Sequence, residues 1–267
     1  MLYRLNDTFF EAFGALFTRF LRGTGSMTLF WCKALAASFG RWNYRLTMDQ
    51  ALRTGVRSLP VALLTALFVG MVGNLSGGVQ LQKFGAKNYV PSMSFIANAR
   101  EMIPVFISFV VGARVTASIA AEIGTMKVTE QLDAMEILNV DAMKYLVAPR
   151  VVATTLMLPL IIIVCLYMAF FGGMAVGASA LNIPPSSYYA MSMRYAYLSD
   201  IYFGLFKGVV FGNIIAVTGC YFGFNTHGGA EGVGRSTTTS VVVTLMLILL
   251  FNFIMTRWFI IISPYLY

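Results

Sequence analysis

The sequence predicts an all-α integral membrane protein with five transmembrane helices, and three observations support this prediction. Hydrophobic residues make up 58% of the 267 residues and charged residues only 11%, compared with about a quarter charged in an ordinary globular domain. A membrane-spanning helix needs about 20 mostly apolar residues, and five stretches of the chain meet that requirement. Basic residues gather in alternate segments between these stretches, as the loops of a multi-pass protein require.

The apolar stretches set the expected spans at about 59–76, 91–121, 151–181, 201–223 and 237–262, which together form one transmembrane domain, 59–267. The second stretch is interrupted by Arg100 and Glu101, whereas the third carries no charge. Two spans with a turn would need about 40 residues. We therefore expect the third stretch to form one tilted helix.

The basic residues predict the orientation. With the N-terminus in the cytoplasm, thirteen of the 19 basic residues lie in cytoplasmic segments, three in outer segments and three within spans. Short cytoplasmic loops are enriched in Lys and Arg, so the N-terminus is expected inside and the C-terminus outside. A basic excess on one side of the spans is a topology signal, so the net charge of +8 does not indicate a nucleic-acid partner.

The segment 1–58 is expected to be cytoplasmic or interfacial. Four phenylalanines recur there at helical spacing, which is typical of a helix lying flat at the headgroup level: Phe9, Phe13, Phe17 and Phe20. A second such helix is expected from Met27 to Phe39, and a soluble cap with its own core is the alternative. Because no cleavage site of small residues is found, we expect the mature chain to begin at Met1.

Glycines repeat every four residues within three of the spans, which lets another helix approach closely. The repeats are Gly73 with Gly77, Gly173 with Gly177, and Gly204 with Gly208 and Gly212. The spacing alone does not distinguish packing within one bundle from a dimer interface.

The charged segment between spans two and three is expected to bind a partner. Apolar residues fall on one helical face, and Glu130, Asp133 and Glu136 fall on another. The apolar face consists of Val128, Leu132, Met135 and Leu138. This pattern predicts a docking helix, and the alternative is a solvated helix on the membrane surface. Anionic headgroups would repel an acidic stripe, which favours a protein partner.

Two further sets of charges fall within the spans. Ionisable groups at membrane depth are costly and usually mark a pathway or a paired contact. Glu101 is expected either to line a cavity for a polar headgroup or to be an interfacial residue satisfied by water. Arg100, next to it, points in another direction and need not pair with it. Lys207 and Arg257 lie near span ends, where snorkelling accounts for them.

Catalytic and metal-binding motifs are not found in the sequence. No GK[ST] motif occurs, so there is no Walker A loop to hold ATP, and any ATP must be hydrolysed by another chain. His227, the only histidine, is expected to be a loop residue without a metal. Three scattered cysteines are expected to serve packing: Cys32, Cys165 and Cys220. We expect no catalytic site, no metal and no cofactor on this chain.

Five spaced blocks resemble the MlaE/YrbE family of permeases, the partners of MCE proteins. The first two are the Phe68–Val72 segment in span one and Arg100-Glu101 with Pro104 and Arg114 in span two. The third and fourth are EIGTM at 122–126 and TEQL with AM at 129–135. The fifth is the glycine-rich segment 223–239, expected as the loop between spans four and five. The resemblance runs from about Gln50 to the C-terminus.

The resemblance implies a homodimer in a bacterial inner membrane, with two cytoplasmic ABC ATPase subunits that use ATP and an outer ring of MCE-domain proteins. Such a complex moves phospholipids or related lipids between membranes. The segment from Glu122 to Leu138 would be the coupling helix. Its candidate contact residues are Glu122, Gly124, Met126, Glu130, Gln131, Leu132, Asp133 and Met135.

For the lipid, we expect two copies to enclose a cavity walled by spans one, two and five. Its candidate residues are Glu101, Arg100, Phe68 and Met71. Three alternatives remain open. A membrane enzyme would need clustered catalytic residues at membrane depth, and an ion-coupled secondary transporter would need several intramembrane acids. A non-transporting scaffold would show the same packing glycines and docking helix.

Overall fold

The computed structural model describes residues 2–40 and 43–262, in which helices predominate and no strand occurs. The α-helices are α1 (Leu2–Ser38), α2 (Tyr44–Thr54), α3 (Leu59–Lys83), α4 (Val90–Ala97), α5 (Ile103–Val128), α6 (Gln131–Ile137), α7 (Ala148–Ala180), α8 (Pro185–Arg194), α9 (Leu198–Phe224) and α10 (Gly229–Ile262). Short 3₁₀ or π turns join them: η1 (Val56–Ser58), η2 (Lys87–Tyr89), η3 (Asn98–Met102) and η4 (Met143–Val147). Five helical segments are long and apolar enough to cross a membrane. The predicted all-α membrane class with five spans is confirmed.

The helical segments extend beyond the predicted spans. They cover Tyr44–Lys83, Lys87–Val128, Met143–Ala180, Leu198–Phe224 and Gly229–Ile261. The third is a single helix through its apolar part, as predicted. The segment 223–239 is mostly helix and not a loop, because α10 already begins at Gly229. Gly228 and Gly229, with φ of 93° and 67°, make the tight turn before it, in which His227 lies as predicted.

Helix α9 forms the centre of the bundle. It packs against α5, α7 and α10, while α3 packs on the other side of α7. Of its apolar span 56% is buried, against 17% for α10. One long side of α10 is therefore left without a partner within the described part of the chain. Cys165 and Cys220 are buried in the core around α9, as predicted, whereas Cys32 is exposed on α1.

Close helix contacts depend on glycine, and the structure separates the predicted repeats. Gly204, Gly208 and Gly212 all face neighbouring backbone of the same chain, so this repeat serves packing within the bundle. Gly173 also packs within the chain, next to Asn74 and Tyr188. The predicted repeat in α3 does not serve packing within the chain. A Cβ atom added at Gly73 or Gly77 would meet no other atom within 4 Å. The contacts to α7 and its end are made instead by Gly70 and Gly78.

This difference predicts opposite effects of alanine at two neighbouring glycines. A Cβ at position 70 would overlap the carbonyl oxygen of Ala169, so Gly70→Ala should cost about 1–3 kcal/mol through overpacking. Gly73→Ala, the matched control, should be neutral or stabilising by up to about 1 kcal/mol, because alanine favours the helix. Thermal unfolding in detergent would measure both. Equal melting temperatures for the two variants would contradict this assignment.

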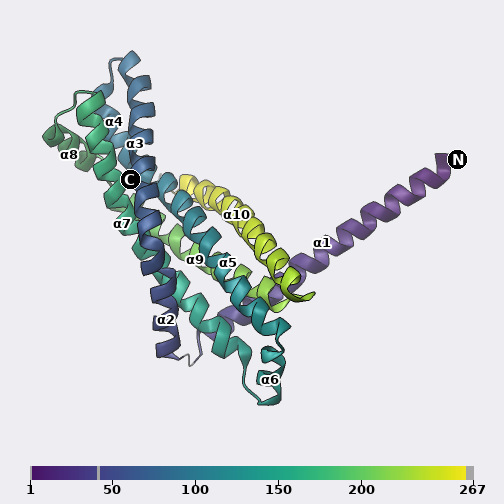
Figure 1. Cartoon of the computed structure of the whole chain (residues 1–267). Coiled ribbons are helices and arrows are strands. Elements are labelled where there is room, and N and C mark those ends of the chain that lie inside the picture. Colours follow the sequence, from purple (N-terminus) through teal and green to yellow (C-terminus); the bar gives the residue numbers. More distant parts are fainter. Residues whose placement is uncertain (1, 41–42, 263–267) are drawn as a thin grey trace.

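Helix α1 is one continuous helix, not the two predicted pieces. Its second half is held on α9 by Trp31, whose Nε1 donates to Asn213 Oδ1 at 2.6 Å, and by Ser26, whose hydroxyl lies 2.7 Å from that of Tyr221. Its first half extends away from the bundle (Figure 1). The predicted phenylalanine face, Phe9 to Phe20, lies outside the residues whose side chains the structure describes.

The connecting elements gather at the two ends of the bundle (Figure 1). Helix α6, the start of α2 and the turn between α9 and α10 lie at one end, and α4 with α8 at the other.

Tyr188 fixes α8 by donating to Asn74 Oδ1 at 2.9 Å. Burial raises the pKa of Tyr188 to about 12, although the Asn74 hydrogen bond acts in the opposite direction. The tyrosine therefore stays a neutral donor at any physiological pH.

Candidate functional site

A polar cluster lies inside the bundle, and Lys207 of α9 is at its centre. The lysine is completely buried. Its Nζ donates to Glu101 Oε1 at 2.7 Å, Thr256 Oγ1 at 2.9 Å and the carbonyl oxygen of Arg100 at 3.0 Å. These three acceptors satisfy all three donors of an ammonium group.

The local sequence explains why one of these acceptors is available. Pro104 opens α5 and has no N–H, so the carbonyl of Arg100, four residues earlier, lacks its usual helical partner. The preceding turn, Asn98–Met102, is π-helical, and such turns are frequent at functional sites. The sequence thus creates a free acceptor at membrane depth, which Lys207 occupies.

Glu101 is held by α10 as well as by α9. The hydroxyl of Thr256 donates to Glu101 Oε1 at 2.8 Å, and Asn252 Nδ2 donates to Oε2 at 3.2 Å. The ring of Phe203 lies 4.6 Å from Lys207 Nζ, at a distance typical of a cation–π contact. The cluster therefore joins spans two, four and five.

A second ion pair lies beside the first. Arg100 Nε donates to Asp200 Oδ1 at 2.6 Å, and the Asp200 side chain is fully buried. The Arg100 guanidinium also lies 5.2 Å from the ring centre of Phe259. Two cations and two carboxylates make the cluster neutral overall, which reduces the cost of keeping ions at this depth.

The cluster corrects the prediction for Lys207 and decides how Glu101 is satisfied. Snorkelling does not account for Lys207, because its side chain points into the bundle and is paired there. Arg257, by contrast, is exposed. Glu101 accepts hydrogen bonds from three protein groups, so it is not satisfied by water alone. Asp200 was not predicted as a site residue, although it lies seven residues before Lys207 and so shares one helical face with it.

An apolar cavity of about 520 Å³ lies on the α8 side of the bundle. Helices α7, α8 and α9 wall it together with α4 and η3, and its lining includes Phe95, Phe170, Tyr167 and Leu205. Neither Phe68 nor Met71 lines it. Phe68 is exposed on α3, whereas Met71 packs towards Gly172 of α7. The cavity that we predict between two copies of the chain would be separate from this one.

The predicted coupling segment is not one helix. Glu130 has a left-handed φ of 60° and separates the end of α5 from the short helix α6. Leu132 is buried and Met135 packs on the core. Leu138 is exposed, as is its neighbour Ile137. The apolar stripe therefore divides: its first part anchors α6, and its end faces outward.

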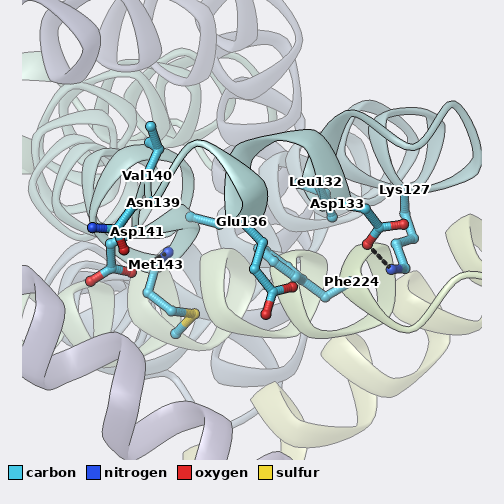
Figure 2. Close-up of a pocket in the computed structure, with 10 residues that line it drawn as sticks. Lys127, Leu132, Asp133, Glu136, Asn139, Val140, Asp141, Met143 and Phe224 are labelled. Carbon is cyan, nitrogen blue, oxygen red and sulfur yellow. Dashed lines mark hydrogen bonds and ion pairs between the residues drawn. The ribbon is translucent and has the colours of Figure 1, made fainter.

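A groove of about 390 Å³ lies between α6, the segment before η4 and the end of α9. Figure 2 shows the acidic side chains of Asp133, Glu136 and Asp141 along it, with Lys127 paired to Asp133 at 2.7 Å. Leu132, Met143 and Phe224 supply apolar lining. This surface is open and about half apolar, and its three acids outnumber its one lysine, which suits a protein segment with basic and apolar side chains.

The other predicted coupling residues lie in different surroundings. Glu122 bridges two arginines, accepting from Arg53 at 2.7 Å and from Arg150 at 2.8 Å. Gly124 is buried against Thr226. Met126 packs on the core and Gln131 is exposed. The structure thus brings Leu132 and Asp133 to the groove but places Glu122 and Gly124 at contacts within the chain.

Known permease sequences are similar to this chain over most of its length. A family model described as Permease MlaE matches residues 47–258. A probable ABC transporter permease protein of Synechocystis sp. is 39% identical over 247 residues, 88% of this chain and 94% of that protein. A probable ABC transporter permease protein of Rickettsia typhi is 41% identical over 212 residues, 79% of this chain and 82% of that protein. The chloroplastic protein TRIGALACTOSYLDIACYLGLYCEROL 1 of Arabidopsis thaliana is 36% identical over 220 residues, 82% of this chain and 63% of that protein.

Proposed function

Because the chain belongs to the MlaE permease family, we propose that it is the membrane subunit of an ABC transporter that moves phospholipids or related lipids between membranes. A separate ATPase supplies the energy. In this proposal two copies form a homodimer in a bacterial inner membrane, with the N-terminus cytoplasmic and an MCE-domain ring on the outer side. The observation that carries the proposal is the family match across residues 47–258.

The groove beside α6 supports the assignment of the ATPase surface. It lies at the same end as α2 (Figure 1), and the basic residues around α2 favour the cytoplasmic side. Its acidic residues and the exposed Ile137 and Leu138 are outside the packed core, so they are available to a partner. We propose that the ATPase seats in this groove and moves the ends of α5 and α7 on either side of α6.

Three features support a lipid cargo and a dimer. The name of the Arabidopsis relative refers to a glycolipid, and the apolar cavity with few polar groups suits an acyl chain. The bare side of α10 suits a second copy, since small or apolar helix faces pack together in membranes. In that dimer Glu101 would stand near the lipid headgroup, with Phe68 on the wall.

The proposed coupling predicts that charge reversal at α6 separates transport from folding. Glu130→Lys with Glu136→Lys alters two exposed acids for which the described structure shows no ion pair. Co-purification of the ATPase and lipid transfer should both fall about tenfold or more, because like charges at an interface cost several kcal/mol. The unfolding temperature should not change. Asp49→Lys on α2 is the matched control, and unchanged ATPase association in the α6 variant would contradict the proposal.

A further inference from the structure

A small pocket lined by arginines lies between α2 and the inner half of α5. Its volume is about 100 Å³, and Arg53, Arg57, Arg114 and Glu122 line it together with Ser118. Helix α2 packs mainly on α7, so a gap towards α5 is left open. The space exceeds that of a single water but is well below the roughly 300 Å³ of a pocket for a whole drug-sized ligand.

The pocket has more positive charge than its own acid can neutralise. Glu122 is its only carboxylate, and it already binds Arg53 and the buried Arg150. Arg114 donates through Nη1 to the carbonyl of Arg57 and, at 3.3 Å, to the hydroxyl of Ser58. Among the described residues, the Arg57 guanidinium has no hydrogen bond or ion pair. The guanidinium groups of Arg57 and Arg114 can therefore donate hydrogen bonds to an anion.

The position of the pocket relates it to the lipid bilayer. Arg57 lies in η1, two residues before α3 begins the apolar part of span one, which places it at the level where lipid headgroups begin. The exposed side chains that follow it at helical spacing are all apolar: Val61, Leu64, Phe68 and Val72. A guanidinium at the headgroup level above an apolar stripe matches the two chemical halves of a phospholipid.

We propose that the pocket binds the phosphate of an anionic phospholipid in the leaflet next to α2, with its acyl chains along the exposed stripe of α3. Guanidinium groups bind phosphate with paired donors. Free phosphate shares this chemistry, but the stripe favours the lipid. The inference depends only on the membrane placement of the spans and not on the direction or cargo of transport. A bound lipid would fill the gap between α2 and α5.

Native mass spectrometry of the full chain with added phosphatidylglycerol tests the proposal. Arg57→Gln should reduce lipid retention about tenfold, the effect of losing one charge-assisted hydrogen bond. Arg45→Gln, at an exposed arginine of α2 outside the pocket, is the matched control and should retain lipid like the unaltered chain. Equal retention in the Arg57 and Arg45 variants would overturn the proposal. Arg57→Gln is preferred to an Arg114 variant because Arg114 also contacts the backbone.

Two further measurements distinguish the ligand sources. Diacylglycerol with the same chains should not be retained, and inorganic phosphate in excess should fail to displace phosphatidylglycerol. Displacement by phosphate would assign the pocket to a free anion and overturn the lipid proposal. A photo-crosslinking amino acid in place of Ser118, used in intact membranes, should form an adduct with lipid. An adduct with protein only would mean that a partner chain occupies the pocket, which also overturns it.

Discussion

Replacing Lys207 with methionine should destabilise the bundle by about 3–5 kcal/mol, because removing one partner of a buried ion pair leaves the other charge uncompensated. Glu101 would lose its cation at 2.7 Å and keep only Thr256 and Asn252. Thermal unfolding in detergent, followed by tryptophan fluorescence, would measure the loss. Lys144→Met provides the control, since Lys144 pairs with Asp141 at an exposed site and such pairs contribute about 1 kcal/mol or less.

A double variant separates the structural role of this pair from a role in transport. Glu101→Gln combined with Lys207→Met removes both charges and should recover most of the lost stability. If the pair only holds the spans together, lipid transfer recovers as well. If Glu101 contacts the headgroup, transfer stays low although the protein is folded. An Lys207→Met chain that unfolds at the temperature of the unaltered chain would contradict the assignment of the buried ion pair.

Glu122→Ala should lower the free energy of unfolding by about 2–3 kcal/mol, because the buried Arg150 would lose its carboxylate. The expected value is below that for Lys207 because Glu122 is 37% exposed in its side chain and solvent screens the pair. Arg150 also keeps its hydrogen bond to the carbonyl of Leu146 at 2.8 Å. Unfolding in detergent is again the measurement.

Comparison with Glu130→Ala shows whether Glu122 acts within the chain or on the ATPase. Glu130 is exposed and has no ion pair in the described structure, so its loss should leave stability within about 0.5 kcal/mol. Under the proposed coupling, it should weaken ATPase association. If Glu122→Ala instead preserved stability and abolished association, Glu122 would be a docking residue, as the family resemblance first suggested.

The spans could be predicted from sequence because they depend on one property, the length of an apolar stretch. Their true ends could not, because polar helical segments such as 44–58 continue the helix beyond the apolar stretch. Lys207 was misplaced for a related reason. It lies six residues after Ile201, the start of the predicted span, which placed it near a span end, whereas it lies nine residues into α9, about 14 Å along the axis. Only the packing of α9 against spans two and five decides that the side chain points inward.

Other parts of the site depend on contacts that no local pattern contains. A spacing of four residues selects several parallel stripes on a helix, so Gly73 and Gly70 are equally plausible until α7 is placed beside one of them. The break at Glu130 follows neither a glycine nor a proline. The polar pattern of α6 was nevertheless informative, because Asp133 and Glu136 do lie along an open groove.

The Lys207 cluster has a mechanical consequence for how the permease can move. Glu101, Lys207 and Thr256 come from three different spans. Their hydrogen bonds hold these spans together at one point, so the three spans should move as one rigid body. Helices α3 and α7 contribute no side chain to these bonds, and α7 is joined to α5 elsewhere, by the ion pair between Arg150 and Glu122. Under the proposed coupling, a movement that begins at α6 should therefore reach the other end of the bundle as a joint rotation of these three spans.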